Sequence, residues 1–361
     1  MKKNLTILFE LVASIVIIVI LGVYLNEIYA SIRDYSVTQG LPIEGAILYK
    51  TLLFVLPLII FITMLRWIVK KQKKQGIKGL FILTSEYFRP RKLRTLFTCF
   101  ILVIILFSYV VIVFQDLLIY FPNYAPGTEM RIEESSRYEK INILSLDGKQ
   151  YDGWAYIDES HTHTILYFGG NAQSSAMFFS EHDALNWDLF KGFNVIMVDY
   201  PGYGLSNGKP NETSIYEMSL IVYDFVSTLN HVDSNKIIVM GFSLGTGVAS
   251  YVASQRDIYK LILVAPFTSI VDVVNLRIPI FYGPFEELLR SKYKTIDRIK
   301  TIDVDTLVIY SLQDEVISAD LSKKVVELIL NVETIVLQQF KHNEILGNQE
   351  LFEEINQFII G

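Results

Sequence analysis

The chain has 361 residues, of which 51% are hydrophobic, and its formal net charge is −6. Its mean hydropathy of +0.36 is high for a purely soluble protein. Residues 1–114 contain 14 Lys and Arg against 5 Asp and Glu, whereas residues 115–361 contain 18 against 33. The acidic C-terminal part argues against a nucleic-acid partner, because phosphate binding requires a basic surface. The single cysteine, Cys99, excludes a disulfide within the chain.

Three apolar runs account for the high hydropathy. They cover residues 5–25, 47–69 and 96–114, and each has about the 20 residues that a helix needs to cross a bilayer. We therefore predict three transmembrane helices in a membrane region that covers residues 1–114. A cleaved signal peptide is the alternative for the first run, since Lys2 and Lys3 precede it. Its apolar core is too long for that, and no small-residue cleavage site follows.

The positive charges beside these runs predict their orientation. The loop between the second and third runs contains nine Lys and Arg, whereas the loop between the first two contains only Arg33. Lys and Arg beside membrane spans stay on the cytoplasmic side. We therefore expect a multi-pass cell-membrane protein whose N-terminus is cytoplasmic and whose chain after Phe114 is extracytoplasmic.

After a predicted linker at residues 115–137, short β-rich runs alternate with stretches of helical spacing. The first two runs alternate polar and apolar residues around Asp147-Gly148, which is typical of a hairpin. The later runs are short and apolar, as expected for parallel strands buried on both faces. We predict an α/β domain at residues 138–361, with a mostly parallel central sheet flanked by helices. The predicted strands are residues 138–146, 152–157, 164–168, 195–198, 237–240, 261–264, 306–310 and 334–337.

One predicted strand, residues 237–240, leads directly into Gly241-Phe242-Ser243-Leu244-Gly245, and helical spacing follows. A strand, a sharp turn and a helix with serine at the apex form the pattern of a nucleophile elbow. Glycine is needed at 241 and 245 because a side chain there would collide with the neighbouring strand and helix. Ser243 is therefore the predicted nucleophile, placed at the positive end of a helix.

A serine nucleophile needs a base and an orienting acid, which here follow the serine in the order Asp or Glu, then His. Only one histidine follows Ser243, namely His342, on the loop after the last predicted strand. A solvated loop residue is its alternative role. Asp314 follows the preceding strand and is the predicted acid. Glu315 and Asp320 compete for this role, although Asp320 also suits the N-terminus of the next helix.

An oxyanion hole requires two backbone N–H donors. One is expected from Leu244, the residue after the nucleophile. The other is expected from the main chain of Asn171, in the Gly-Gly-Asn-Ala loop at residues 169–172, where glycines let the backbone approach a substrate closely. A plain turn is the alternative interpretation of this loop.

Taken together, these motifs resemble the Bem46-like, serine-aminopeptidase-like membrane-anchored branch of the α/β-hydrolase family. The resemblance covers about residues 115–361. It implies an α/β-hydrolase fold, here preceded by three transmembrane helices, with the triad Ser243, Asp314 and His342 and a donor at Asn171. The family usually has His-Gly-Asn and a single span, so Gly169 and the two additional apolar runs depart from it. The matching segments are Leu118–Pro122, Gly170–Ala172, Asp199–Ser206, Gly241–Gly247, Ala265–Ser269, Asp314 and His342-Asn343.

We expect a membrane-anchored serine hydrolase that cleaves an ester, thioester or amide bond through an acyl-enzyme. An esterase is preferred to a peptidase, because no cluster for reading substrate charge is visible. The expected partners are a small acyl or peptide substrate and the lipid bilayer. No cofactor and no metal are expected, since no His, Cys, Asp or Glu set has ligand spacing. The alternative is a catalytically silent hydrolase fold that acts as a membrane interaction module.

The insertion at about residues 270–300 is short for a lid over the site. Its segment Ile278–Pro284 is apolar. We expect this segment either to line the acyl pocket or to lie near the membrane surface.

Overall fold

The computed structural model describes residues 90–185 and 192–361, and the chain divides into two compact units, residues 1–111 and 112–361. The predicted membrane segments at 5–25 and 47–69 lie outside the described residues. The third, 96–114, falls within helix α4 (Pro90–Ile119). Within the described part of the chain, no helix combines the length and the apolar character that crossing a bilayer would require.

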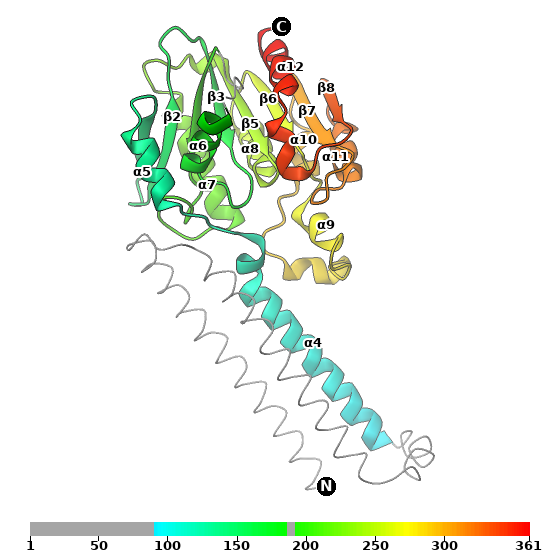
Figure 1. The fold of residues 1–361 in the computed structure, drawn as a ribbon. Coiled ribbons are helices and arrows are strands. Elements are labelled where there is room, and N and C mark those ends of the chain that lie inside the picture. Colours follow the sequence, from blue (N-terminus) through cyan, green and yellow to red (C-terminus); the bar gives the residue numbers. More distant parts are fainter. Residues whose placement is uncertain (1–89, 186–191) are drawn as a thin grey trace. The chain divides into compact units, whose positions relative to one another are not determined.

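The second unit contains an eight-stranded sheet in the order β1-β2-β4-β3-β5-β6-β7-β8 (Figure 1). Strands β1 and β2 form the predicted antiparallel hairpin, and β2 also pairs antiparallel with β4. Every other neighbouring pair is parallel, which confirms the prediction of a mostly parallel sheet. The strands are β1 (Glu139–Leu144), β2 (Gln150–Tyr156), β3 (His163–Phe168), β4 (Phe193–Val198), β5 (Ile237–Phe242), β6 (Lys260–Val264), β7 (Thr306–Ser311) and β8 (Val332–Leu337).

Helices cover both faces of this sheet (Figure 1). Between β6 and β7, a short insertion contains two small α-helices and one 3-10 helix. The helices are α5 (Pro126–Glu134), α6 (Ser175–Leu185), α7 (Glu212–Val226), α8 (Leu244–Gln255), α9 (Ile270–Asn275), η2 (Gly283–Leu288), α10 (Thr295–Ile299), α11 (Ala319–Val326), η3 (His342–Gly347) and α12 (Gln349–Ile360).

Residues 115–137, predicted as a linker, are largely helical. Helix α4 continues to Ile119, and α5 begins at Pro126, a residue well suited to a first helical turn. Helix α5 packs on the domain because Ile132 is buried and the indole nitrogen of Trp154 donates a 3.0 Å hydrogen bond to Glu129. The sequence of α5 is mostly polar, so a packed helix at residues 126–134 was not predicted.

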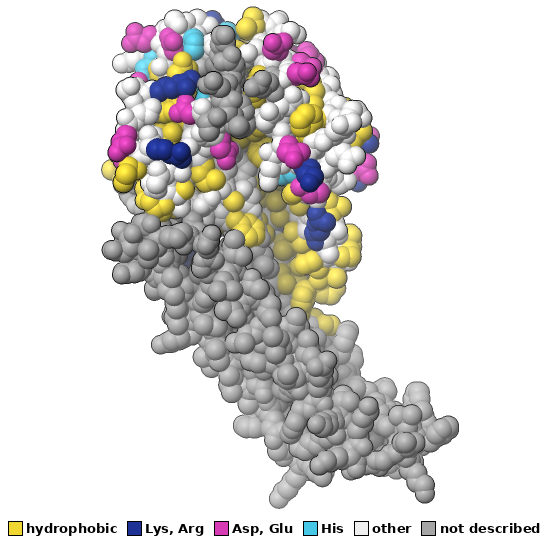
Figure 2. Space-filling model, in the orientation of Figure 1, with side chains coloured by type: hydrophobic (Ala, Val, Ile, Leu, Met, Phe, Trp, Pro, Cys, Tyr) yellow, Lys and Arg dark blue, Asp and Glu magenta, His cyan; other side chains and the backbone are white. Residues whose placement is uncertain are grey.

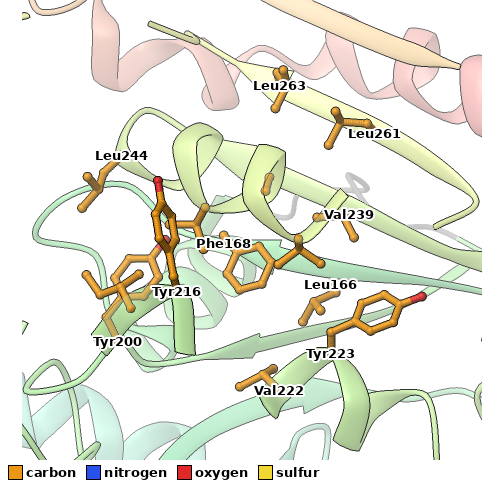
Figure 3. Packing of buried hydrophobic residues seen from close by; sticks show 14 of the residues in the cluster. Leu166, Phe168, Tyr200, Tyr216, Val222, Tyr223, Val239, Leu244, Leu261 and Leu263 are labelled. Carbon is orange, nitrogen blue, oxygen red and sulfur yellow. The ribbon is translucent and has the colours of Figure 1, made fainter. Parts of the chain in front are cut away.

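Alternate residues of the central strands point to opposite faces, and each face has its own helices. In β3, Leu166 and Phe168 belong to a core that includes residues of α7, α8, α10 and α11. Ile165 and Tyr167 belong to a second core with residues of α5, α6 and α12. Figure 3 shows part of the first core. Burial on both faces is the reason why these strands are continuously apolar in sequence.

Helix α7 corresponds to the predicted apolar stripe at residues 215–229. Asn211 caps its N-terminus, because its side-chain oxygen accepts a 2.9 Å hydrogen bond from the backbone nitrogen of Ser214. The Ser214 hydroxyl in turn accepts a hydrogen bond from the backbone nitrogen of Asn211. Such a reciprocal box satisfies two free N–H groups of the first turn. The buried residues of the helix, Ile215, Met218 and Val222 among them, face the first core.

Candidate active site

Ser243 occupies the sharp turn between β5 and α8. Its backbone has φ 51° and ψ −117°, a conformation that residues with a side chain rarely adopt. The turn is tight because neighbouring backbone fills the space beside it. A Cβ atom on Gly241 would lie 2.3 Å from the carbonyl oxygen of Gly245, and one on Gly245 would lie 1.9 Å from that of Phe168. Both positions therefore require glycine, as the sequence predicted.

The imidazole of His342 lies against the Ser243 hydroxyl, with 2.9 Å between Nε2 and Oγ. His342 opens the short helix η3 just after β8, and its side chain is almost fully buried. The Phe242 ring stacks on the imidazole, with 5.0 Å between ring centroids and 27° between planes. This packing restricts the rotation of the imidazole, so that Nε2 stays directed at the serine.

Asp314 completes the arrangement from the loop after β7. Its Oδ2 lies 2.7 Å from Nδ1 of His342, and the carboxylate is 2% exposed. The other carboxylate oxygen accepts hydrogen bonds of 2.8 Å from the backbone nitrogens of Val316 and Ile317. These two bonds fix the plane of the carboxylate. The structure thus brings together the three residues predicted from sequence.

The two competing acids lie elsewhere. The carboxylate of Glu315 accepts a 3.2 Å hydrogen bond from the backbone nitrogen of His342, not from its ring. Hydrogen bonds from its own backbone and from that of His342 lower the pKa of Glu315. Asp320 is exposed in the first turn of α11, where its backbone nitrogen donates to the capping Ser318. Neither carboxylate is bonded to the imidazole of His342.

The two predicted oxyanion donors are backbone N–H groups that have no acceptor among the described residues. Leu244 is the first residue of α8, where N–H groups have no partner within the helix. Asn171 lies in the loop after β3, and the hydrogen bonds of its neighbourhood do not use its backbone nitrogen. Both N–H groups are therefore available to a substrate.

The side chain of Asn171, which the sequence did not single out, holds this loop in place. Its oxygen accepts hydrogen bonds from the Tyr203 hydroxyl (2.7 Å) and from the Phe121 backbone nitrogen (3.0 Å). Its amide nitrogen donates to the carbonyl oxygen of Ile119 at 2.6 Å. The carboxamide thus joins the loop to the segment that leaves α4 and to the turn after β4.

Two more tyrosines hold the same loop. The Tyr200 hydroxyl donates a 2.8 Å hydrogen bond to the carbonyl oxygen of Gly169. The side-chain oxygen of Gln173 accepts from the Tyr167 hydroxyl (3.0 Å) and from the Gly170 backbone nitrogen (3.1 Å). All these hydroxyls are buried, so the loop is fixed by polar contacts that water does not weaken. The Asp199–Ser206 motif was the one sequence signal that pointed to this support.

Asp199, at the end of β4, is a fully buried carboxyl near this network. It accepts a 2.6 Å hydrogen bond from the backbone nitrogen of Ser175. Burial raises the pKa of Asp199 to about 7, because a charged carboxylate is poorly stabilised away from water. A Cβ atom on residue 204 would lie 1.9 Å from the other carboxylate oxygen of Asp199, so residue 204 must be glycine.

The described residues contain no group of three His, Cys, Asp or Glu side chains placed to hold a metal ion. A buried hydroxyl, an imidazole and a carboxylate lie in series beside two free N–H groups.

Sequence comparison places similar proteins in several kingdoms. The profile of a family described as alpha/beta hydrolase fold matches residues 163–289. An uncharacterized protein of Mycobacterium tuberculosis is 29% identical over 251 residues, which cover 68% of this chain and 87% of that protein. The alpha/beta hydrolase domain-containing protein WAV2 of Arabidopsis thaliana is 30% identical over 227 residues, which cover 57% of this chain and 72% of that protein.

Solved structures with the same architecture include two hydrolases. An esterase of Pyrococcus furiosus has a TM-score of 0.52 at 19% identity, over 67% of this chain and 97% of that chain. A 2,6-dihydroxy-pseudo-oxynicotine hydrolase has a TM-score of 0.52 at 19% identity, over 64% of this chain and 70% of that chain. Such low identities show the fold alone, and the fold is the predicted one.

Proposed function

This chain belongs to the α/β-hydrolase family, and from that premise we propose that it is a membrane-anchored serine hydrolase with Ser243 as nucleophile. The observation that carries the proposal is the pair of short contacts on His342. Nε2 lies 2.9 Å from the Ser243 hydroxyl, and Nδ1 lies 2.7 Å from the Asp314 carboxylate. This is the arrangement by which a weakly nucleophilic hydroxyl is activated.

In the proposed acylation step, Nε2 of His342 takes the proton of Ser243 as its oxygen attacks the substrate carbonyl carbon. Asp314 holds the proton on Nδ1, so that the unprotonated Nε2 faces the serine. The imidazolium then protonates the leaving alcohol, thiol or amine. An acyl group remains on the serine oxygen.

The negative charge of the tetrahedral intermediate is assigned to the backbone N–H groups of Leu244 and Asn171. Fixed donors stabilise this charge without reorganising during the reaction. A water molecule then attacks the acyl-enzyme, with His342 again acting as base, and releases the acid. The restored serine completes the cycle.

The bond cleaved is an ester, thioester or amide, with ester favoured over peptide. No charged cluster suited to reading a peptide is evident from the sequence. The membrane part of the proposal rests on the three apolar runs and on the cations between the second and third. Anchoring is also what the resemblance to the Bem46-like branch implies, although that branch usually has a single span. In this proposal the catalytic domain lies outside the cytoplasm.

The direct test is labelling of the full chain with a fluorophosphonate, a reagent that reacts with activated serines. We expect one labelled residue, Ser243, and loss of labelling in Ser243→Ala. Ser254→Ala is the matched control, since the hydroxyl of this serine bonds only within α8, donating to the carbonyl of Tyr251 and accepting from the Gln255 side chain. A folded protein that does not label would favour the silent interaction module instead.

A further inference from the structure

An exposed group of apolar side chains lies in the insertion between β6 and β7. We call residues 276–285 the apolar insert. Its sequence, Leu-Arg-Ile-Pro-Ile-Phe-Tyr-Gly-Pro-Phe, contains one cation and no acid, although residues 115–361 are strongly acidic. Figure 2 shows hydrophobic side chains gathered at this place. The exposed ones are Leu276 (48%), Ile278 (51%), Ile280 (41%), Tyr282 (60%) and Phe285 (43%).

The backbone of the insert holds these side chains in place. The Asn275 carboxamide pairs with both backbone groups of Phe281, donating to its oxygen at 3.0 Å and accepting from its nitrogen at 2.9 Å. Phe281 is buried and anchors the turn, while Ile278 bonds back to Val274 at 2.8 Å. The exposed apolar side chains are therefore presented by an ordered turn, and they do not result from a loose loop. Such patches mark interaction surfaces.

Two residues just after the apolar insert, Leu288 and Arg290, are bonded to the residues that follow the third apolar run. Gln115, the first residue after 96–114, is buried and donates a 3.1 Å hydrogen bond to the carbonyl oxygen of Leu288. Its side-chain oxygen accepts from the Arg290 backbone nitrogen at 2.6 Å. The Arg290 guanidinium forms a 2.6 Å ion pair with Asp116. A residue that directly follows a membrane span lies at the level of the lipid head groups.

The start of the insert contacts the catalytic loop. The guanidinium of Arg277 donates a hydrogen bond to the backbone carbonyl of Glu315, next to Asp314. The insert is therefore bonded to the edge of the sheet where the triad lies, and the residues just after it, Leu288 and Arg290, are bonded to Gln115.

We infer that the apolar insert docks on the surface of the lipid bilayer. This inference rests on the membrane anchoring proposed above. Aliphatic and aromatic side chains without acids suit the boundary between head groups and acyl chains, where tyrosine is also favoured. Docking directs the catalytic edge of the sheet toward substrates held in the membrane.

The test uses the full chain with Cys99→Ser, which removes its single cysteine, and one new cysteine labelled with a polarity-sensitive fluorophore. The test positions are Ile278→Cys and, independently, Tyr282→Cys. The matched control is Leu330→Cys, an exposed apolar position (72%). It lies just before β8 begins, at the end of the strands opposite to the triad. The proteins are reconstituted in phosphatidylcholine vesicles that contain some phosphatidylglycerol.

We expect blue-shifted emission at 278 and 282 and loss of emission when spin-labelled lipid is added, with neither change at 330. If the protein floats with the vesicles but positions 278 and 282 behave like 330, the docking inference is overturned while anchoring stands. If the protein does not float, the anchoring itself fails. Disulfide formation between two copies of unlabelled Ile278→Cys under an added oxidant would also overturn the inference, in favour of a homodimer.

Discussion

The hydroxyl of Tyr203 donates a 2.7 Å hydrogen bond to the side-chain oxygen of Asn171, 32 residues away in sequence. This bond holds the loop that carries a proposed oxyanion donor, although Tyr203 is not assigned any contact with substrate. It makes Tyr203 a positioning residue. Removal of the Tyr203 hydroxyl should therefore slow the chemical step and leave folding unchanged.

We therefore expect Tyr203→Phe to lower kcat about tenfold, less than the loss of an oxyanion donor itself, and to leave KM nearly unchanged. The measurement is steady-state hydrolysis of a soluble ester. Tyr151→Phe is the matched control, because the Tyr151 hydroxyl is equally buried and has no hydrogen-bond partner among the described residues. Equal effects of the two substitutions would contradict the positioning role.

The choice between two neighbouring acids gives a second prediction. Asp314→Asn should lower kcat by about 10⁴-fold, because the amide favours the wrong imidazole tautomer. Glu315→Gln should keep kcat within a small factor, since the Glu315 carboxylate accepts from the backbone nitrogen of His342 and not from its ring. Steady-state hydrolysis of a soluble ester measures both values of kcat. A larger loss in Glu315→Gln than in Asp314→Asn would refute the assignment.

Gly204 lies close against the buried Asp199. Its φ is +46°, and an added Cβ would lie 1.9 Å from the Asp199 carboxylate. Gly204→Ala should lower the free energy of unfolding by about 2–4 kcal/mol. Gly127→Ala, in the first turn of α5 with no atom within 4 Å of the new Cβ, should raise it by up to about 1 kcal/mol. Urea unfolding in detergent, followed by circular dichroism, measures the stability of both variants. Similar unfolding midpoints for Gly204→Ala and Gly127→Ala would contradict the close contact between Gly204 and Asp199.

The raised pKa of Asp199 predicts a pH dependence of stability. Its pKa rises from an ordinary value of 3.8 to about 7 in the folded protein, so the folded state binds the proton more tightly. Between these values the free energy of unfolding should therefore fall as pH rises, by up to about 4 kcal/mol.

Other carboxyls with raised pKa values, such as Glu129 and Asp152, add slopes of the same sign. The contribution of Asp199 is isolated by comparison with Asp199→Asn, in which residue 199 does not titrate. The variant should show a flatter profile between about pH 4 and pH 7. Identical slopes in the two proteins would show that residue 199 does not titrate in this range.

Much of the fold was predictable because its signals are local. The strands around 165, 196 and 238 are short apolar runs, since both faces of the sheet are covered. Helix α5 was missed because its sequence is polar and its stability comes from Glu129 and Ile132 contacting distant residues. Burial of so few side chains leaves no periodic pattern.

The sequence by itself was enough to predict Ser243 as the proposed nucleophile and His342 as its proposed base. A strand, two required glycines and a serine form a local pattern around Ser243, and only one histidine follows it in the chain. Tertiary structure decided what no local pattern specifies. Asp314 and Glu315 are adjacent acids on one loop, and only the approach of His342 from β8 distinguishes the carboxylate that meets its ring. The role of the Asn171 side chain likewise depends on partners 32 to 52 residues away, which only folding brings within hydrogen-bonding distance.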